Sequence, residues 1–467
     1  MQVPKTNLPD WSSLIPVLPG QGPRLRELYA ALRRLIETGQ LAPGTKLPPS
    51  RALAERLKMS RAAVVGAFEQ LQADGFVESR IGAGTFVARH VPLLEDAPPP
   101  PAPPPPIFPI DAPGTLGRAI EDRRTLTQFR RLLNWHLTRP GPEFYSYGDP
   151  RGGLALRQAL ADYLRTARGV RCTPEQIILT SGTQQGLDLT LRLLLKPGDA
   201  AWMEDPGYPR ALTALRGFGA LVAGVPVDGE GLDPMAGDAL CPMARLAYVT
   251  PSHQFPLGVP MSMRRRLALI AWAKKREAWI IEDDYDSEFR YAGPPLTSLQ
   301  GLDDSGRVIY LGSFSKVLMP GLRMGYLVAP PELLDPMVAL RHRNDRQPSV
   351  LAEAALADLI TQGHFAAHLR RVRKLAEDAR DALASALPPP YEVTVPAQGL
   401  HLLARLPDHE DDQARLTAAQ NLGMGGRALS SLYHQQSPQQ GLVLGFSGYS
   451  PQQMRDLGNA LSAYGQE

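Results

Sequence analysis

The residues of this chain most suited to covalent chemistry lie close together in the sequence. Lys316 follows Ser313-Phe314-Ser315 and lies seven positions before Arg323. The apolar run at 308–311 just before them is typical of a buried strand. A lysine past a strand end can form a Schiff base with an aldehyde cofactor, while the two serines and the arginine donate to a phosphate. The alternative is a surface lysine, because so short a motif also occurs by chance.

Acidic residues follow a second apolar run. Trp279-Ile280-Ile281 leads into Glu282-Asp283-Asp284-Tyr285-Asp286, and open α/β sheets hold ligands at the carboxyl ends of such strands. Asp283 could pair there with a protonated pyridine nitrogen, and Tyr285 could reach a ring oxygen. A metal site is the alternative. Because no histidine or cysteine lies near this cluster in the sequence, we expect no metal.

A third group of residues could bind an anion. The run 177–180 is predicted to be a short buried strand, and Ser181-Gly182-Thr183 then opens an apolar helix that extends over 187–195. Free backbone N–H groups and the dipole at the start of that helix would face a phosphate beside Gly182 and Thr183. An ordinary strand–helix turn capped by threonine is the alternative.

The elements that must position these residues form an alternating pattern. Further apolar runs at 200–203, 221–227 and 246–250 are separated by helical stretches. This alternation favours an α/β domain built on a largely parallel sheet.

Composition indicates a globular protein with more than one domain. The chain has 467 residues, of which 43% are hydrophobic and 21% charged. No apolar run approaches the ~20 residues of a membrane-spanning helix, and the N-terminus lacks a signal-peptide pattern. Cys172 and Cys241 lie far apart, so we expect small core residues rather than a disulfide framework or a zinc site. We therefore expect a cytoplasmic protein with no membrane partner.

The first 90 residues differ from the rest in charge. They hold 12 Lys and Arg against 7 Asp and Glu, a surplus of +5, whereas the whole chain carries +3, which leaves −2 for the remainder. A basic module on a near-neutral body predicts an anionic partner for the first part only.

Periodicity predicts a winged helix-turn-helix in that basic part. Apolar spacing indicates helices at 23–37, after Ser50 and after Ser60, with both serines as N-caps, and then a Gly-tipped hairpin over 76–87. The third helix would enter the major groove of double-stranded DNA by its N-terminal end. The alternative is a three-helix bundle with a stray hairpin and solvated arginines.

Several residues of this predicted module could contact DNA. Ser60 and Arg61 would meet bases and phosphates, whereas Arg51 and Arg80 would bind the backbone, which positions the protein without specifying a sequence. Gly82 lies in the hairpin tip, where the wing would approach DNA.

A proline-rich stretch separates the two parts. Eight of the nine residues from Pro98 to Pro106 are proline, a composition that favours polyproline II over helix or sheet. We therefore predict a DNA-binding domain at 14–90, a semi-rigid linker at 91–110 and a second domain at 111–467. An SH3-type ligand is the alternative for the prolines.

The first domain resembles the GntR-type winged helix. The matching motifs are Leu47-Pro48-x-Ser50-Arg51, Ser60-Arg61, Gly75-Phe76-Val77 and Gly82-Ala83-Gly84-Thr85-Phe86-Val87. Ala62, Ala63 and Val65 stand where that family usually carries polar residues or arginine. This departure reduces direct hydrogen bonding to bases, although alanine can still contact thymine methyl groups.

The second domain resembles the fold-type I pyridoxal-phosphate enzymes of the aspartate aminotransferase group. Ser181-Gly182-Thr183, Asp283-x-Tyr285 and Ser313-x-Ser315-Lys316 with Arg323 occur in that group's chain order. Joined to a GntR-type head, they make the chain similar to the MocR, or GabR-type, regulators from about residue 14 to 463. The resemblance implies a winged helix-turn-helix (α+β) plus an α/β aminotransferase-like domain with a smaller C-terminal α/β subdomain.

The resemblance also implies roles for single residues. Lys316 would hold pyridoxal 5′-phosphate, Asp283 would pair with its ring nitrogen and Tyr285 with its ring hydroxyl. The phosphate would be held by Gly182, Thr183, Ser313, Ser315 and Arg323. Tyr208 would lie beside the ring with Arg210 near the effector. Tyr147 would reach the phosphate of a partner subunit, which implies a homodimer, with domain swapping as one arrangement.

Two departures from the aminotransferase pattern bear on the effector. Phe255 takes the place of an asparagine that contacts the ring hydroxyl, and His253 or Gln254 would have to replace that contact. Val443 stands where the arginine that grips a substrate carboxylate is expected. Arg210 or Arg427 would then bind the effector, or the effector is not an α-amino acid held in the usual way.

Three functions fit these residues. The leading hypothesis is a transcriptional regulator that binds operator DNA and senses an amine or amino acid at Lys316. The second is a working aminotransferase with an appended DNA module. In the third, pyridoxal phosphate itself is the signal. Whether the protein turns over substrate is left open by the sequence.

Overall fold

The computed structural model describes residues 24–80, 82–89, 111–293 and 296–463. The chain divides into two compact units, residues 1–106 and 107–467, each of which is described by itself. The predicted linker at 91–110 lies outside the described residues, so the domain boundaries stay predictions.

The described residues of the N-terminal unit form three helices and a two-stranded sheet. They are α1 (Arg24–Glu37), α2 (Ser50–Arg56), α3 (Arg61–Ala73), β1 (Val77–Arg80) and β2 (Gly84–Val87). Its core takes one apolar stripe from each helix, including Leu28, Leu53 and Val64, and closes on Val87 of the hairpin. The predicted helices and hairpin are confirmed.

One predicted cap is wrong and the other is confirmed. Ser50 is the first residue of α2 rather than its N-cap, because the helix starts one residue early, after Pro49. Ser60 caps α3 as expected, since its hydroxyl accepts a hydrogen bond of 3.2 Å from the backbone N–H of Ala63.

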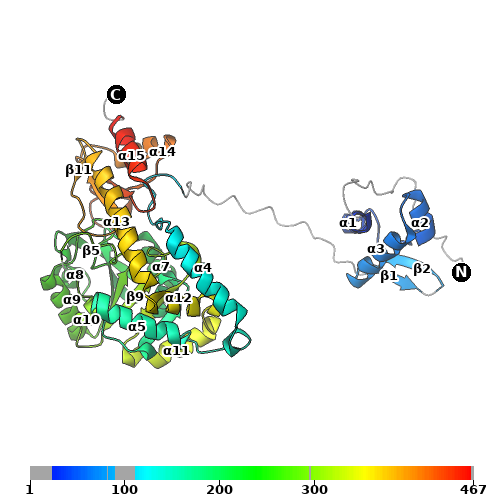
Figure 1. The fold of residues 1–467 in the computed structure, drawn as a ribbon, viewed down its shortest axis with the longest axis horizontal. Coiled ribbons are helices and arrows are strands. Elements are labelled where there is room, and N and C mark those ends of the chain that lie inside the picture. Colours follow the sequence, from blue (N-terminus) through cyan, green and yellow to red (C-terminus); the bar gives the residue numbers. More distant parts are fainter. Residues whose placement is uncertain (1–23, 81, 90–110, 294–295, 464–467) are drawn as a thin grey trace. The chain divides into compact units, whose positions relative to one another are not determined.

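The C-terminal unit contains two sheets covered by helices (Figure 1). Its strands are β3 (Ile177–Thr180), β4 (Ala200–Asp205), β5 (Leu221–Asp228), β6 (Gly231–Leu232), β7 (Leu246–Val249), β8 (Trp279–Asp284), β9 (Val308–Ser313), β10 (Gly325–Val328), β11 (Glu392–Val393), β12 (His401–Arg405), β13 (Arg427–Ala428) and β14 (Gly441–Gly445). Its α-helices are α4 (Arg123–Thr138), α5 (Leu154–Arg168), α6 (Thr183–Leu194), α7 (Pro209–Phe218), α8 (Pro234–Leu240), α9 (Met263–Arg276), α10 (Leu299–Leu302), α11 (Pro331–Asp345), α12 (Glu353–Thr361), α13 (His364–Ser385), α14 (Asp412–Asn421) and α15 (Pro451–Ala463). Short 3-10 helices are η1 (Pro142–Phe144), η2 (Pro174–Gln176), η3 (Pro320–Leu322), η4 (Val350–Ala352) and η5 (Ser430–Leu432).

The large sheet has the order β3-β10-β9-β8-β7-β4-β5-β6. Its centre, from β9 to β5, is parallel, and β3, β10 and β6 pair antiparallel at the two sides. Strands β3, β7 and β8 are buried along their whole length, which explains why they read as unbroken apolar runs. The parallel centre brings the carboxyl ends of β8 and β9 to one edge, so Asp283 and Lys316 approach each other.

The smaller sheet is antiparallel, with the order β11-β12-β14-β13. The long helix α13 runs from this sheet alongside α4 and α12 (Figure 1). Cys172 and Cys241 are free and partly buried, and each packs against a hydrophobic core cluster. Among the described residues, no helix combines the length and the apolar character needed to cross a bilayer.

Candidate functional site

Lys316 lies just past the end of β9 and is half-buried. Its Nζ donates a hydrogen bond of 3.1 Å to the backbone carbonyl of Gly117, 199 residues earlier in the chain. Burial lowers the pKa of this lysine, although Asp286 and Asp283 act in the opposite direction. A lowered pKa increases the fraction of neutral amine, which is the nucleophilic form.

Asp283 lies on β8, and its buried carboxylate has a hydrogen-bond partner for only one of its two oxygen atoms among the described residues. Its Oδ2 accepts a hydrogen bond of 2.5 Å from the hydroxyl of Tyr248, whereas its Oδ1 is buried and has no partner among the described residues. Burial raises the pKa of Asp283 to about 6. An unpaired buried carboxylate oxygen is costly unless something else binds it.

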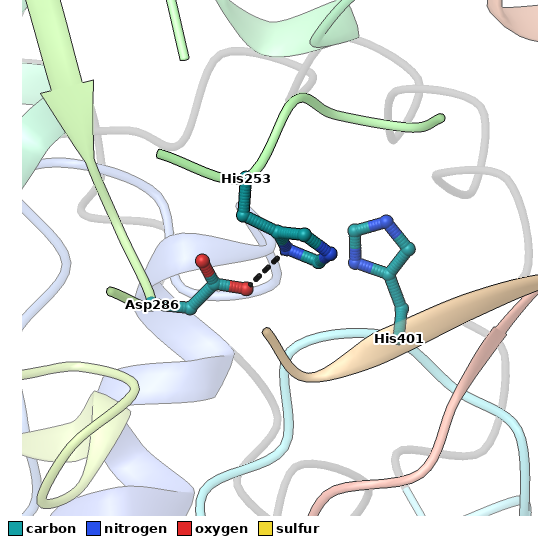
Figure 2. A group of neighbouring side chains, drawn as sticks. All are labelled: His253, Asp286 and His401. Atoms are coloured by element: carbon teal, nitrogen blue, oxygen red, sulfur yellow. Dashed lines mark hydrogen bonds and ion pairs between the residues drawn. The ribbon is translucent and has the colours of Figure 1, made fainter. Parts of the chain in front are cut away.

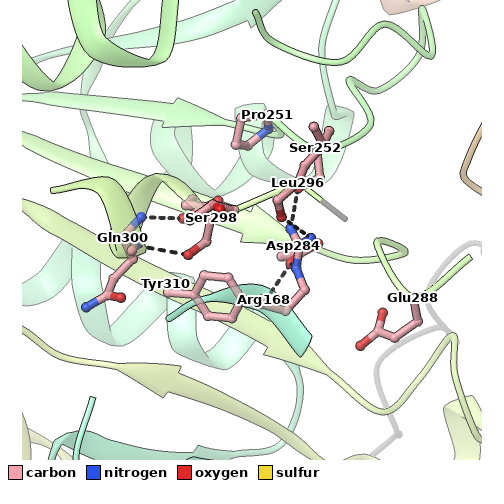
Figure 3. Close-up of polar contacts among 12 residues, drawn as sticks. Arg168, Pro251, Ser252, Asp284, Glu288, Leu296, Ser298, Gln300 and Tyr310 are labelled. Carbon is pink, nitrogen blue, oxygen red and sulfur yellow. Dashed lines mark hydrogen bonds and ion pairs between the residues drawn. The ribbon is translucent and has the colours of Figure 1, made fainter. Parts of the chain in front are cut away.

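Asp284, the next residue, has a different role. Its Oδ2 accepts bonds of 2.7 Å from Nε of Arg168 and 2.5 Å from the hydroxyl of Tyr310 (Figure 3). Arg168 also donates to the carbonyl of Leu296 and the hydroxyl of Ser252. The charges of this buried pair therefore neutralise each other, and Asp284 joins β8 to α5. Its Oδ1, like that of Asp283, is buried and has no partner among the described residues.

Glu282, the first residue of the acidic cluster, bonds the backbone of a neighbouring helix. Its two carboxylate oxygens each accept a bond of 2.9 Å, from the backbone N–H groups of Leu299 and Gln300, which start α10. Of these three carboxylates, Asp283 is the one that accepts no hydrogen bond from an arginine or a backbone N–H among the described residues.

Tyr285 lies beside a group of buried histidines. Its hydroxyl donates a bond of 2.9 Å to the backbone carbonyl of His253 and lies 3.2 Å from the Nδ1 of that residue. The same Nδ1 is 2.9 Å from Oδ2 of Asp286, and the rings of His253 and His401 face each other with centroids 4.6 Å apart (Figure 2). Burial, and then the neighbouring His253, lower the pKa of His401 well below its usual range.

The histidine group corrects one step of the sequence reasoning. No histidine lies near the acidic cluster in the sequence, but folding brings His253 and His401 to Asp286, with ligand-capable atoms all within 4.8 Å of one another. Gln254 does not replace the absent asparagine in this structure, because its side chain bonds the backbone of Pro206, Phe255 and Leu257.

The predicted anion site is assembled from separate segments. Gly182 has φ +111° and precedes α6, where a Cβ on it would touch the guanidinium of Arg323 at 3.5 Å. Arg323 itself has φ +49°, a left-handed conformation that non-glycine residues adopt at a cost of roughly 1–2 kcal/mol. Ser313 accepts a bond of 2.9 Å from the backbone N–H of Ser315. The start of α6, with Thr183, thus lies next to the arginine from the lysine loop.

The two arginines considered for the effector are both exposed. Neither Arg210 nor Arg427 has an ion-pair partner among the described residues. Burial and the charge of Asp283 raise the pKa of Tyr208, whereas the positive charges of Arg210 and Arg427 lower it. Arg427 is paired directly opposite Val443 across β13 and β14, so it lies on the strand next to the expected arginine position.

Tyr147 is not part of this site within one chain. Its side chain is 72% exposed, and the guanidinium of Arg346 lies 3.8 Å from the centre of its ring. The adjacent N–H of Gly148 bonds the side chain of Gln347. Tyr147 is therefore held at the surface by the segment that follows α11.

The candidate DNA-contacting residues are exposed on the N-terminal unit. Arg51 lies in the first turn of α2 and Arg61 in the first turn of α3. Arg80 is ion-paired with Glu78 at 2.5 Å and lies over the ring of Phe86, which reduces its availability to phosphate. Gly82, at φ +75°, lies in the hairpin turn.

Sequence reasoning missed three contributors to the site. Tyr248 and Arg168 bond the carboxylates of β8, and the carbonyl of Gly117 bonds Lys316. Tyr248 lies on a strand that the sequence did predict, so its position beside β8 was a usable signal. Nothing local marks Arg168 or Gly117, because their partners lie 116 and 199 residues away.

Comparison with known proteins matches both units. The family described as "Bacterial regulatory proteins, gntR family" matches residues 25–87, and "Aminotransferase class I and II" matches residues 126–423. The probable rhizopine catabolism regulatory protein MocR of Rhizobium meliloti is 38% identical over 94% of this chain and 93% of its own length. The pyridoxine biosynthesis regulator PdxR of Corynebacterium glutamicum is 34% identical over 92% and 93%.

The solved structures that are similar cover the C-terminal unit. A Pyrococcus horikoshii kynurenine aminotransferase, determined in complex with PMP, matches with a TM-score of 0.69 and 27% identity, over 75% of this chain and 90% of its own. The expected aminotransferase-like fold is therefore confirmed.

Proposed function

The chain belongs to the GntR family of bacterial regulatory proteins, in the MocR subfamily with an aminotransferase class I and II domain, and on that premise we propose that a small molecule captured at Lys316 controls its binding to operator DNA. The family makes it a DNA-binding transcriptional regulator. The observation that carries the proposed sensing is the pair formed by a half-buried amine and a buried carboxylate with an unpaired oxygen.

The residues fit the family's cofactor, pyridoxal 5′-phosphate. The Oδ1 of Asp283 is a buried acceptor that awaits a donor, which a protonated ring nitrogen supplies. Arg323 and the start of α6 bring positive charge and free N–H groups to one place, as a phosphate requires. When bound, the cofactor supplies an aldehyde for the lysine and an electron-withdrawing ring.

This chain's own residues prepare that site. Burial lowers the pKa of Lys316 and so makes its amine more nucleophilic near neutral pH. The hydroxyl of Tyr285 donates to the carbonyl of His253, and Tyr285 is the residue that would donate to the ring oxygen of a bound cofactor. Asp286 accepts from His253 and thereby fixes which ring nitrogen carries the proton.

The effector is an amine or amino acid, or the cofactor itself. Arg210 and Arg427 are the charged groups that would hold its anionic end, since Val443 is buried and apolar. Arg427 lies opposite Val443 on the neighbouring strand, so it approaches from a different direction than an arginine at 443 would. This geometry favours an effector other than an α-amino acid held in the usual way.

A homodimer is part of the proposal. Tyr147 is exposed and stacks with Arg346, and an exposed side chain is available to a neighbouring subunit. Paired winged helices would bind two half-sites one helical turn or a multiple of it apart.

A second candidate function is transamination. The same lysine and aspartate are the minimum for half-reaction chemistry, and the similarity to aminotransferases of known structure favours it. A regulator does not need catalytic turnover. An aminotransferase needs a residue that binds the substrate carboxylate, and this chain has Val443 where that arginine is expected.

The test is a titration of full-length protein on DNA from upstream of its own gene. We expect the affinity for that DNA to change when pyridoxal phosphate, or an amine added to the loaded protein, is present, and we expect Lys316→Ala to remove the response. An unchanged affinity with all ligands would contradict the proposal. Repeated conversion of an amino donor by the loaded protein with a keto acid would favour the enzyme instead.

A further inference from the structure

The first described segment after the linker passes directly over Lys316. We call residues 111–122 the strap. Its Gly117 accepts the hydrogen bond from the Lys316 amine, and a Cβ built on Gly117, which has φ +84°, would overlap that amine. No side chain fits between the strap and Lys316, so a chemical change at Nζ alters its direct contact with the strap backbone at Gly117.

The end of the strap nearest the linker is joined to the C-terminal sheet. Gly114 forms a β-bridge with Gly445 of β14, whose N–H donates to the Gly114 carbonyl at 2.8 Å. The N–H of Gly425 donates to Pro113 at 2.6 Å, and the hydroxyl of Tyr449 donates to Ala112 at 2.8 Å. The strap therefore acts as an added edge of that sheet.

The other end of the strap is held by charge. Asp122 caps α4 and accepts bonds from His368 and Arg371 of α13 at 2.9 and 2.7 Å. Between its ends the strap lines a cavity of about 530 Å³, together with Leu318 and Met319 from the lysine loop. The middle of the strap thus has space beside it, whereas its two ends are fixed.

We propose that the strap is the relay between Lys316 and the linker, so that capture of a ligand at the lysine changes operator affinity through residues 112–117. The inference rests on the proposed function of Lys316. In the sequence, the strap directly follows the predicted linker at 91–110, so the chain passes through the strap on its way from the DNA-binding unit to Lys316.

The chemistry at Lys316 removes the contact that the strap uses. When the amine attacks an aldehyde carbon, a C=N bond forms, the aldehyde oxygen leaves as water, and the nitrogen keeps at most one proton. That proton is fixed in the plane of the new bond, whereas the N–H groups of the free amine can rotate, so the bond to the Gly117 carbonyl is lost when the nitrogen is unprotonated and is restricted in direction when it is protonated. The free and loaded forms therefore differ at the strap, which is the condition for a ligand to shift an equilibrium.

Two glycines with nearly the same positive φ provide a matched test. Gly114 has φ +94°, and a Cβ there would meet the carbonyl oxygen of Gly425 at 2.5 Å, whereas Gly198 has φ +93° and no atom within 4 Å of its Cβ position. Both Gly114→Ala and Gly198→Ala place a Cβ at a positive φ that side-chain-bearing residues rarely adopt. Only the first separates the strap from the C-terminal sheet, and neither residue touches Lys316.

The measurement is operator affinity of the full-length variants with and without pyridoxal phosphate. We expect the cofactor to change the affinity of wild type and Gly198→Ala by about fivefold or more, and that of Gly114→Ala by less than about twofold, as loss of coupling requires. Borohydride reduction must show that Gly114→Ala still captures the cofactor. A variant that captures it and keeps the wild-type response would overturn the relay, and so would one that cannot capture it.

A gentler variant guards against misfolding of Gly114→Ala. Tyr449→Phe removes only the hydroxyl that bonds Ala112, and we expect it to reduce the same response while capture is kept; a full response would again overturn the relay. The proposed function fails separately, because wild type would then show no capture at Lys316 or no change in affinity.

Discussion

Replacing Asp283 by asparagine should stabilise the cofactor-free effector body and weaken its hold on the cofactor. The carboxylate is 6% exposed, and its Oδ1 has no partner among the described residues. Burial raises its pKa from 3.8 to about 6. The neutral form is therefore favoured by folding, and the corresponding stability is present below pH 4 and lost as the pH rises through 6.

The magnitude follows from that shift. About two pKa units correspond to about 3 kcal/mol of cost for the ionised group well above pH 6. The amide of asparagine can still accept from Tyr248, but its NH₂ group replaces the unpaired Oδ1 and costs about 1–2 kcal/mol. We therefore expect a net gain of about 1–2 kcal/mol at pH 7.5 and a smaller gain at pH 5.

Asp284→Asn provides the matched control, because it changes the next carboxylate on the same strand. That change leaves Arg168 buried without its counter-charge, and removing one member of a buried pair costs about 3–5 kcal/mol. The two neighbouring substitutions should therefore change stability in opposite directions.

Urea unfolding of the cofactor-free protein, followed by tryptophan fluorescence, measures both variants. Four of the five tryptophans (Trp135, Trp202, Trp272 and Trp279) lie in the effector body, so the signal reports that unit. Cofactor affinity of Asp283→Asn should fall about tenfold to a hundredfold, as expected for loss of a charge-assisted hydrogen bond. If Asp283→Asn destabilised the protein as much as Asp284→Asn, Asp283 would be a structural charge and the reasoning would be refuted.

Three further predictions follow from the same contacts. Lys316→Ala should abolish the borohydride-stable cofactor linkage while circular dichroism and Tm are kept; a retained linkage would place it on another amine. Arg61→Ala should weaken operator binding by about 1–3 kcal/mol and reduce the slope of log affinity against log salt concentration by about one. It should leave the absorbance of the bound cofactor unchanged. Unchanged binding in a gel-shift series would exclude Arg61 from the DNA interface. Burial raises the pKa of Glu204 and of Glu282 to about 7, so the stability that these two carboxyls contribute is present below pH 4.5 and is lost as the pH rises through 7. The urea concentration at the unfolding midpoint of the cofactor-free protein should therefore fall between pH 5 and pH 8. A rise of that midpoint over the same range would contradict the burial argument.

Elements whose sequence signal is local were predictable. The strands at 177–180 and 308–311 are buried on both faces and therefore appear as unbroken apolar runs, and the Ser60 cap follows from hydroxyl chemistry one turn away. The proximity of Asp283 to Lys316 could also be expected, since adjacent parallel strands bring their carboxyl ends together.

Local sequence signals did not predict the contacts that determine which carboxylate is available to bind a ligand. Asp283 and Asp284 are adjacent and chemically identical, and they differ in their partners, because Tyr248 bonds the first whereas Arg168, from α5, and Tyr310 bond the second. Gly117 likewise gives no local sign that its carbonyl will meet Lys316. Ser50 was misassigned because proline and serine can both precede a helix, and one residue of difference at a boundary moves the cap.

The most direct test of the account is to find where the cofactor becomes attached. Full-length protein would be mixed with pyridoxal 5′-phosphate, reduced with borohydride, digested, and its peptides identified by mass spectrometry. The account predicts that the phosphopyridoxyl group is found on the peptide that contains Lys316 and that Lys316→Ala yields no such peptide. Unmodified Lys316 in a protein that carries the label elsewhere, or that carries no label, would contradict it.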